Sequence, residues 1–221
     1  MQARDSLLPV QRRALVALAG LEPRWTLTGG GALAGFHLGH RLTRDVDLFF
    51  RDRSLLERLG EDAERLLKTH GFEVSRLVTT PAFVQLRVVN SGDVLVVDLV
   101  ADPVAAIEPS LDAVIDEVHL AIDSLHEILV NKLCALLGRS EIRDLVDVGA
   151  ILSSGGDLQR AVRDAPKKDA GFSALTLAWV LSRYPAAKLA PSYGLDADAM
   201  EKARATLEAD LVALAKAESD R

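Results

Sequence analysis

The spacing of apolar residues in the first half of the chain predicts alternating helices and strands. Apolar positions at helical spacing predict a first helix over residues 8–21, and two more over 32–38 and 54–70. Ser54 has the position of an N-cap with Glu57 three residues later, and Gly71 follows the last helical residue. Short apolar or alternating runs predict strands at 25–28, 45–50, 72–78, 82–90 and 94–100.

The second half of the chain has only helical patterns. Helices are predicted over 124–137, 143–153, 157–165, 172–182 and 196–216, with breaks at glycines and prolines. We therefore predict an α+β (mixed α/β) fold, in which a mixed β-sheet flanked by helices precedes a C-terminal helical bundle. The predicted boundary separates residues 1–122 from residues 123–221.

Composition and charge exclude several classes of protein. The chain has 221 residues, of which 49% are hydrophobic and 26% are charged, as in an ordinary globular protein. A net charge of −6 excludes a generally basic nucleic-acid binder but leaves room for a local basic patch. One cysteine excludes an internal disulfide, and the longest apolar run, 174–181, is too short to cross a bilayer. We expect a cytoplasmic monomer with no membrane partner.

A glycine-rich turn gives the first chemical signal. Gly29, Gly30 and Gly31 lie between a predicted strand and a predicted helix. Glycines let a ligand approach the backbone closely, and the N–H groups that open a helix attract phosphate. A plain tight turn would use the same glycines, and no Gly-Lys-Ser/Thr sequence of a P-loop follows.

Three aspartates on predicted strands give the second signal. Asp45 and Asp47 are two residues apart, so both carboxylates lie on one face of their strand. Such a pair suits Mg²⁺, although a solvated strand end paired with Arg41 or Arg44 is the alternative. Asp98 lies within the run VLVVDLV, where an unpaired charge is costly to bury. If the two strands are neighbours, the carboxylates converge as in two-metal sites for displacement at phosphorus.

Several other candidates have ordinary structural explanations. Asp102 is four residues beyond Asp98 and precedes a proline, so we expect it in a loop. His37 and His40 could form a transition-metal site with Asp45, but no further histidine or cysteine cluster supports one. Core positions are expected for three residues in apolar surroundings, namely Trp25, Cys134 and Trp179.

A second charged motif occurs at residues 132–147, KLCALLGRSEIRDLVD. Lys132, Arg139, Arg143 and Asp147 would share one face if a single helix continued through them, although Gly138 interrupts it. Cations on that face could neutralise triphosphate oxygens, and the aspartates could orient them. An amphipathic surface helix with ordinary charge pairs is the alternative.

The glycine turn followed by His-Arg-x-Thr-x-Asp-x-Asp resembles the nucleotidyltransferase superfamily that includes DNA polymerase β. More narrowly, GGGALAGFHLGHRLTRDVDLFF resembles the AbiEii/AbiGii group of abortive-infection type IV toxins, and so does the motif at 132–147. One departure is Gly31, where the superfamily commonly has a serine or threonine that contacts nucleotide phosphate.

The resemblance implies a magnesium-dependent enzyme that transfers a nucleoside monophosphate from an NTP such as ATP to a hydroxyl. It implies two Mg²⁺ ions and metal ligands at Asp45, Asp47 and Asp98, which are catalytic together with Lys132 and Asp144. The implied nucleotide-binding residues are Gly29, Gly30, Gly31, Arg41, Thr43, Lys132 and Arg143.

The same resemblance implies tRNA as the acceptor and a role as the toxin of a toxin–antitoxin pair, with a cognate antitoxin as partner. Residues 1–122 would form the catalytic core, and the helical region would complete the active site and bind the acceptor. Two alternatives stay open. The enzyme could modify a small molecule or a protein hydroxyl, or the protein could be a catalytically silent nucleotide-binding or antitoxin-like partner, which Gly31 would favour.

Overall fold

The computed structural model describes residues 1–51 and 53–219, without the side chains of residues 218 and 219. Its internal contacts divide the chain into two compact units, Met1–Ser124 and Leu125–Arg221. Unit 1 contains the β-sheet, and unit 2 is helical. The predicted α+β class, with a mixed sheet followed by a helical region, is confirmed.

Unit 1 is built on a mixed sheet whose strands have the order β3-β4-β5-β2-β1-β7-β6. β2 runs parallel to β5 and β1 runs parallel to β7, while the other neighbouring pairs are antiparallel. The strands are β1 (Thr26–Thr28), β2 (Asp45–Arg51), β3 (Glu73–Thr79), β4 (Phe83–Asn90), β5 (Asp93–Asp102), β6 (Leu111–Ile115) and β7 (Val118–Ile122).

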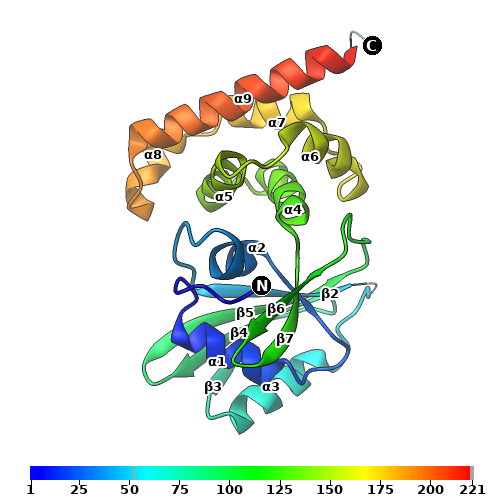
Figure 1. Ribbon diagram of the computed structural model, residues 1–221, viewed down its shortest axis with the longest axis vertical. Helices are drawn as coiled ribbons and strands as arrows, with labels where there is room; N and C mark the ends of the chain where they lie inside the picture. The colour runs from blue at the N-terminus through cyan, green and yellow to red at the C-terminus, as the bar shows by residue number, and fades with distance from the viewer. Residues whose placement is uncertain (52, 220–221) are drawn as a thin grey trace. The chain divides into compact units, whose positions relative to one another are not determined.

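One face of this sheet is apolar, and helices α1 (Pro9–Leu18) and α3 (Leu59–Thr69) lie against it (Figure 1). Alternate residues of β2 and β5 point to this face and are fully buried, among them Val46, Leu48 and Leu99. The residues between them point to the opposite face and are only half-buried. This alternation places Asp45 and Asp47 of β2 and Asp98 of β5 on the second face.

The chain enters a helix directly from β1. α2 (Gly29–Ala32) is followed without a break by a π-helical turn, Leu33–His37. We predicted that this helix begins at Ala32, but it begins at the first glycine of the turn. The glycines therefore form the opening of the helix, where backbone N–H groups have no partner within the helix.

Two parts of unit 1 differ from prediction. α3 begins at Leu59 with Arg58 as its N-cap, so the expected start at Ser54 is wrong. Glu57 has φ +49, a left-handed conformation that prevents the helix from beginning earlier. The hairpin of β6 and β7 was not predicted, because its turn at Asp116 and Glu117 adopts positive φ without glycine or asparagine.

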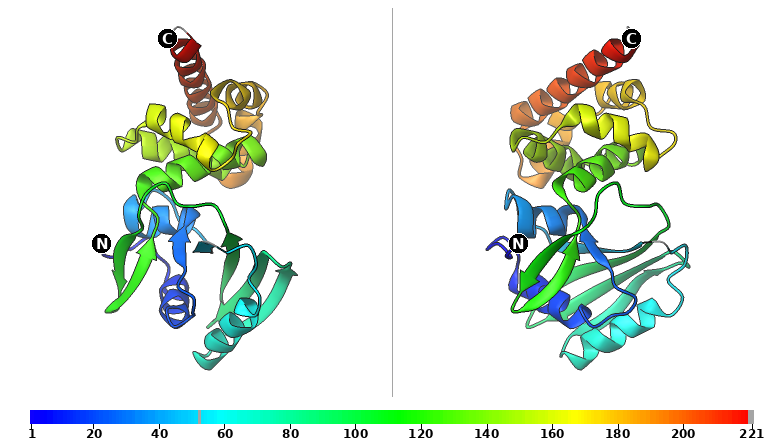
Figure 2. Two further views of the ribbon diagram at one scale, coloured as in Figure 1. Left: turned by 90° about the vertical axis from the view of Figure 1, so that its right-hand side faces the viewer. Right: turned by 45° about the vertical axis from the view of Figure 1, so that its right-hand side comes forward.

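Unit 2 consists of packed helices, and the longest, α9, lies along α7 and α8 (Figures 1 and 2). The helices are α4 (Leu125–Gly138), α5 (Ile142–Ser153), α6 (Leu158–Asp164), α7 (Ala174–Ser182), α8 (Ala186–Leu189) and α9 (Ala197–Ser219). Within the described part of the chain, no helix is both long and apolar enough to cross a membrane.

The two tryptophans have different environments. Trp25 is buried as predicted, and its indole N–H donates to the carbonyl of Leu18 at 2.8 Å. Trp179 on α7 is 58% exposed, so the prediction of a core position is wrong. The run 174–181 is apolar except for Thr176, and such a pattern does not indicate which side of a helix is covered. Cys134 is half-buried, and burial raises the pKa of its thiol to about 11.

Candidate active site

Four polar side chains form a row across the half-buried face of the sheet. Thr28 on β1 pairs in register with Asp47 on β2, and Asp47 pairs with Asp98 on β5. Asp98 in turn pairs with Gln85 on β4. Residues in register on neighbouring strands project from the same face and lie close enough to interact. We call these four residues the polar row.

The polar row brings together carboxylates from distant parts of the sequence. Asp45 lies two residues from Asp47 on the same face and pairs in register with Val96. Gln85 donates from Nε2 to Oδ1 of Asp98 at 3.0 Å, which holds that carboxylate in place. Like charges so near one another favour a bound cation, because the cation offsets their repulsion.

The carboxylates and the hydroxyl on this face are groups that a divalent cation prefers as ligands, although their positions in the structure do not surround one. Within the described residues, no three Asp, Glu, His or Cys side chains are close enough to hold a metal ion. The hydroxyl of Thr28 is buried and has no hydrogen-bond partner there, and such groups normally have one. Carboxylates on rigid strands beside a buried hydroxyl match the ligand chemistry of Mg²⁺, so the residues fit the implied metal.

The glycine turn packs directly against charged side chains of the site. Gly29 has φ +62, and a Cβ atom there would collide with Oδ2 of Asp47. A Cβ atom at Gly30 would lie 2.7 Å from Nη2 of Arg41, so this guanidinium lies over the turn. Gly31 is crowded by backbone, since its Cβ would lie 3.3 Å from the carbonyl oxygen of Asp45. The turn thus has a cation and a carboxylate beside the first helical N–H groups.

Two predicted residues near the turn have contacts within the protein. The hydroxyl of Thr43 accepts a hydrogen bond from Nε2 of Gln11 at 2.8 Å, and both residues are buried. Nε2 of His37 lies 2.8 Å from the backbone oxygen of Asp123. Burial lowers the pKa of His37, and Arg4 lowers it further, which favours the neutral ring. The contact of Thr43 with nucleotide stays a prediction. The ring of His37, considered above as a metal ligand, instead contacts the backbone oxygen of Asp123.

Asp102 is the last residue of β5, so the expectation that it lies in a loop is wrong. Strand β5 continues past Val100 because it pairs with β2 as far as Arg51. Arg51 forms ion pairs with Asp102 and with Asp123, the latter at 2.8 Å. This arginine therefore neutralises two carboxylates that lie outside the polar row.

The charged motif of unit 2 forms an ion-pair network whose lysine and two aspartates are buried. Nζ of Lys132 lies 2.7 Å from Asp144 and 2.8 Å from Asp147, and both aspartates are fully buried. Arg139 donates to Asp144 at 3.0 Å and 3.1 Å. Burial opposes the charge of Lys132, but the two carboxylates outweigh it and raise the pKa of this lysine. The lysine is therefore charged at neutral pH.

This network does not use the continuous helical face that we predicted. α4 ends at Gly138 and α5 begins at Ile142, so the network is formed across the turn between two helices. Arg143 lies outside it and pairs with Glu141 at 3.1 Å, where its side chain is 46% exposed. Lys132 and Asp144 are thus members of one ion-pair network, whereas the side chain of Arg143 is about half-exposed and pairs with Glu141.

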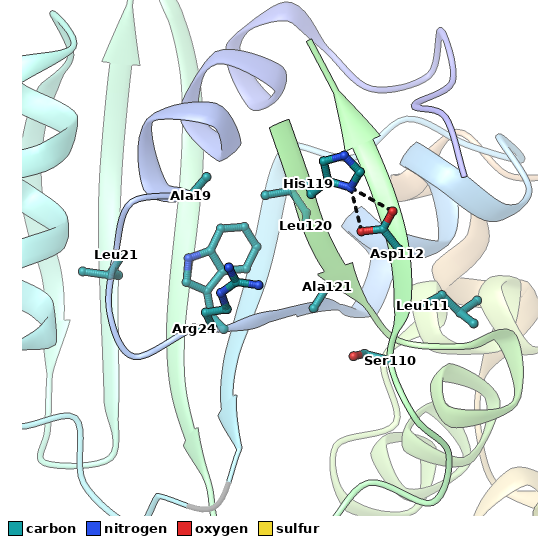
Figure 3. Close-up of a pocket in the computed structure, with 10 residues that line it drawn as sticks. Ala19, Leu21, Arg24, Ser110, Leu111, Asp112, His119, Leu120 and Ala121 are labelled. Carbon is teal, nitrogen blue, oxygen red and sulfur yellow. Dashed lines mark hydrogen bonds and ion pairs between the residues drawn. The ribbon is translucent and has the colours of Figure 1, made fainter. Parts of the chain in front are cut away.

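A separate cavity of about 210 Å³ lies beside the β6–β7 hairpin (Figure 3). His119 and Asp112 form a hydrogen-bonded pair at its edge, with Nδ1 of His119 2.9 Å from the carboxylate. Arg24 also lines it. None of the residues of the polar row or the glycine turn lines this cavity.

Sequence reasoning missed two members of the polar row. Thr28 directly precedes the three glycines, and Gln85 is a polar residue within an apolar strand. Each signal is weak alone, since threonine is common in strands and glutamine is common on their exposed faces. Only the register between distant strands places both residues beside the aspartates.

Comparisons with solved structures place this fold among known ones. JHP933 from Helicobacter pylori has a TM-score of 0.56 at 18% identity, covering 96% of this chain and 93% of that one. A second Helicobacter pylori structure, assigned to the nucleotidyltransferases, has a TM-score of 0.55 at 19% identity, covering 96% and 95%. At these identities the likeness establishes the fold.

The sequence itself identifies the family. No curated protein matches the chain. The model of the family described as the nucleotidyl transferase AbiEii toxin of type IV toxin–antitoxin systems matches residues 13–217, which is nearly the whole chain. The chain is therefore a nucleotidyltransferase that belongs to the AbiEii family of type IV toxins.

Proposed function

We propose that this protein transfers a nucleoside monophosphate from an NTP to a hydroxyl of RNA, with tRNA as the acceptor, in a magnesium-dependent reaction. The observation that carries the proposal is the polar row, which sets Asp47 and Asp98 in register beside the glycine turn. Carboxylates next to a helix opening combine a site for cations with a site for phosphate.

In this proposal Asp45, Asp47 and Asp98 hold Mg²⁺, which when bound neutralises charge on the triphosphate. The backbone N–H groups of the glycine turn and the guanidinium of Arg41 bind phosphate oxygens. Asp98 accepts the proton of the acceptor hydroxyl, and Gln85 keeps that carboxylate oriented. The hydroxyl oxygen then bonds to the α-phosphorus while the bond to pyrophosphate breaks.

The departure at Gly31 has a local explanation in the packing of the turn. A side chain there would press on the carbonyl of Asp45, so the hydroxyl common at this position in the superfamily has little room. Thr28 supplies a buried hydroxyl from the other end of the same turn. We propose that Thr28 takes over part of that phosphate contact.

We assign the remaining roles by the motif at 132–147. Lys132 and Asp144, which form an ion pair at 2.7 Å, keep the catalytic role that the motif implies, and Lys132 also binds nucleotide in this proposal. Arg143, which pairs with Glu141 in the structure, keeps the nucleotide-binding role that the motif implies. A cognate antitoxin is the expected partner because the family is one of type IV toxin–antitoxin systems. We propose the cytoplasm as the compartment in which the protein acts, since tRNA and NTPs are found there.

The proposal is tested with each NTP labelled at the α-phosphate. The full-length protein is incubated with tRNA, with a mixture of proteins, or with aminoglycosides, each with Mg²⁺ or with a chelator. We expect label on tRNA only, and only with the metal. If only protein or only the small molecules are labelled, that class of molecule and not RNA is the acceptor. If none of them is labelled, the result favours a catalytically silent protein.

A substitution of Gly29 by alanine tests the contact between the glycine turn and Asp47. The left-handed φ should cost about 1 kcal/mol of unfolding free energy, and the new Cβ must displace the Asp47 carboxylate. Because small misplacements at a reacting centre are costly, we expect about a hundredfold slower nucleotide transfer.

Gly71→Ala is the matched control for this substitution. Gly71 follows α3 with φ +80, and no atom lies within 4 Å of the position that a Cβ atom would take there. We expect the same loss of stability in a denaturant titration, with unchanged transfer. Equal transfer rates in the two variants would show that the Gly29–Asp47 contact has no part in the reaction.

A further inference from the structure

Helix α7 presents an exposed aromatic side chain stacked with a cation. Trp179 is 58% exposed, and the guanidinium carbon of Arg183 lies 4.5 Å from the centre of its ring. The other side of α7 is buried within unit 2 through Leu177, Ala178 and Leu181. The fold of the helix is therefore secured without Trp179, whose indole faces solvent.

The segment around Trp179 is locally positive although the chain is acidic. No acidic residue occurs between Ala170 and Leu195, whereas the whole chain has 32. Its two cations are Arg183 and Lys188, and neither forms an ion pair with a carboxylate among the residues described. Tyr193, the other exposed aromatic residue of the described chain, lies in this same segment.

Two of the acidic residues of α9, Glu201 and Glu208, share one cation. Arg204 pairs with Glu201 at 2.7 Å and also with Glu208. The same arginine donates to the carbonyl of Leu181 at the end of α7, 2.9 Å away. Part of the negative charge of α9 is thus offset by a cation that reaches the end of α7, and Arg183 and Lys188 add positive charge on the segment itself.

We propose that Trp179 and Arg183 form a binding site for a single-stranded RNA end, in which a base stacks on the indole and the guanidinium contacts phosphate. The site rests on the proposed function, since it names a surface that holds the RNA acceptor. Bases stack on aromatic side chains whatever their sequence, and a neighbouring arginine adds charge and stacking area. The acid-free segment and the cation–π pair favour a polyanion over an apolar protein partner.

Binding is measured by fluorescence anisotropy in the absence of NTP, with the full-length protein. The probe is a fluorescein-labelled RNA hairpin that ends in a few unpaired nucleotides at its 3′ end, and a blunt hairpin is compared. We expect Trp179→Ala to weaken binding of the overhang about tenfold or more, while Trp179→Phe retains most of the affinity. Arg183→Gln should weaken binding and reduce its dependence on salt.

Leu175→Ala is the matched control, because Leu175 lies one turn before Trp179 and is 57% exposed. Base stacking needs the indole and not the leucine, so affinity should stay within about twofold of the wild type. Equal losses from Leu175→Ala and Trp179→Ala would overturn the proposal in favour of an apolar docking surface. Wild-type affinity of Trp179→Ala for the overhang would also overturn it, as would conversion of a dimer to a monomer by that substitution.

The two proposals fail separately. If the wild type labels tRNA and Trp179→Ala binds and labels it equally well, the stacking site is excluded and the proposed function stands. If Trp179 supports binding of the overhang but the wild type transfers no nucleotide to RNA, the proposed function is excluded and the binding site stands.

Discussion

Replacing both Asp45 and Asp47 with alanine is expected to lower nucleotide transfer by about a thousandfold or more, with the protein still folded. Both carboxylates lie on the half-buried face of β2, and they are the proposed ligands that bring cation and triphosphate together. Removing charge stabilisation at a phosphoryl-transfer site costs several kcal/mol of activation free energy. Transfer is measured with α-labelled NTP, and folding by circular dichroism during heating.

The fold should survive because neither aspartate contributes to the apolar face covered by α1 and α3. Relief of repulsion between like charges leaves the melting temperature unchanged or slightly raised, as is common when active-site charges are removed. Asp93→Asn is the control, since Asp93 is exposed at the start of β5, the strand that also carries Asp98. Transfer at the wild-type rate by the double variant would exclude this face as the active site.

Replacing Lys132 with methionine is expected to lower the free energy of unfolding by about 3–5 kcal/mol. The substitution leaves Asp144 and Asp147 fully buried without the ammonium group that lies 2.7 Å and 2.8 Å from them. Since folded proteins are stable by about 5–15 kcal/mol, this loss is a large fraction of the total. Urea titration followed by circular dichroism measures it.

Arg143→Gln removes one positive charge from the same motif and serves as the control for stability. Its ion pair with Glu141 is about half-exposed, so the expected loss is below about 1 kcal/mol. Adding Asp147→Asn to Lys132→Met should restore part of the stability, because one uncompensated buried charge is then removed. Equal stability of Lys132→Met and the wild type would show that the buried network does not hold unit 2 together.

Strand β2 could be predicted because alternation of apolar and polar residues is typical of a strand with one covered face, and β5 because its run is almost wholly apolar. In β2, Val46, Leu48 and Phe50 are fully buried while Asp45 and Asp47 are not, as their spacing predicted. The glycine turn was likewise visible as local sequence. Both features depend on neighbouring residues, which is the range over which sequence patterns are informative.

The other features of the candidate site depend on which segments far apart in the sequence contact one another, and local sequence patterns do not predict these contacts. Thr28 and Gln85 join the polar row only through register across β1, β2, β5 and β4. The ion pairs of Lys132 depend on the turn between α4 and α5, which breaks the helical face expected from spacing. The prediction that Trp179 is buried was wrong because an apolar run does not indicate which side of its helix is covered by other elements.

Strand β1 is held between β2 and β7, and β7 is the last strand of the sheet to be synthesised. Pairing between segments so far apart in sequence requires the closure of a long loop, so it is slow compared with the formation of local hairpins. β3, β4 and β5 can pair early, since they follow one another along the chain. The sheet around β1 is therefore completed only after β7 has been synthesised, and a nascent chain that ends before Val118 leaves one edge of β1 unpaired.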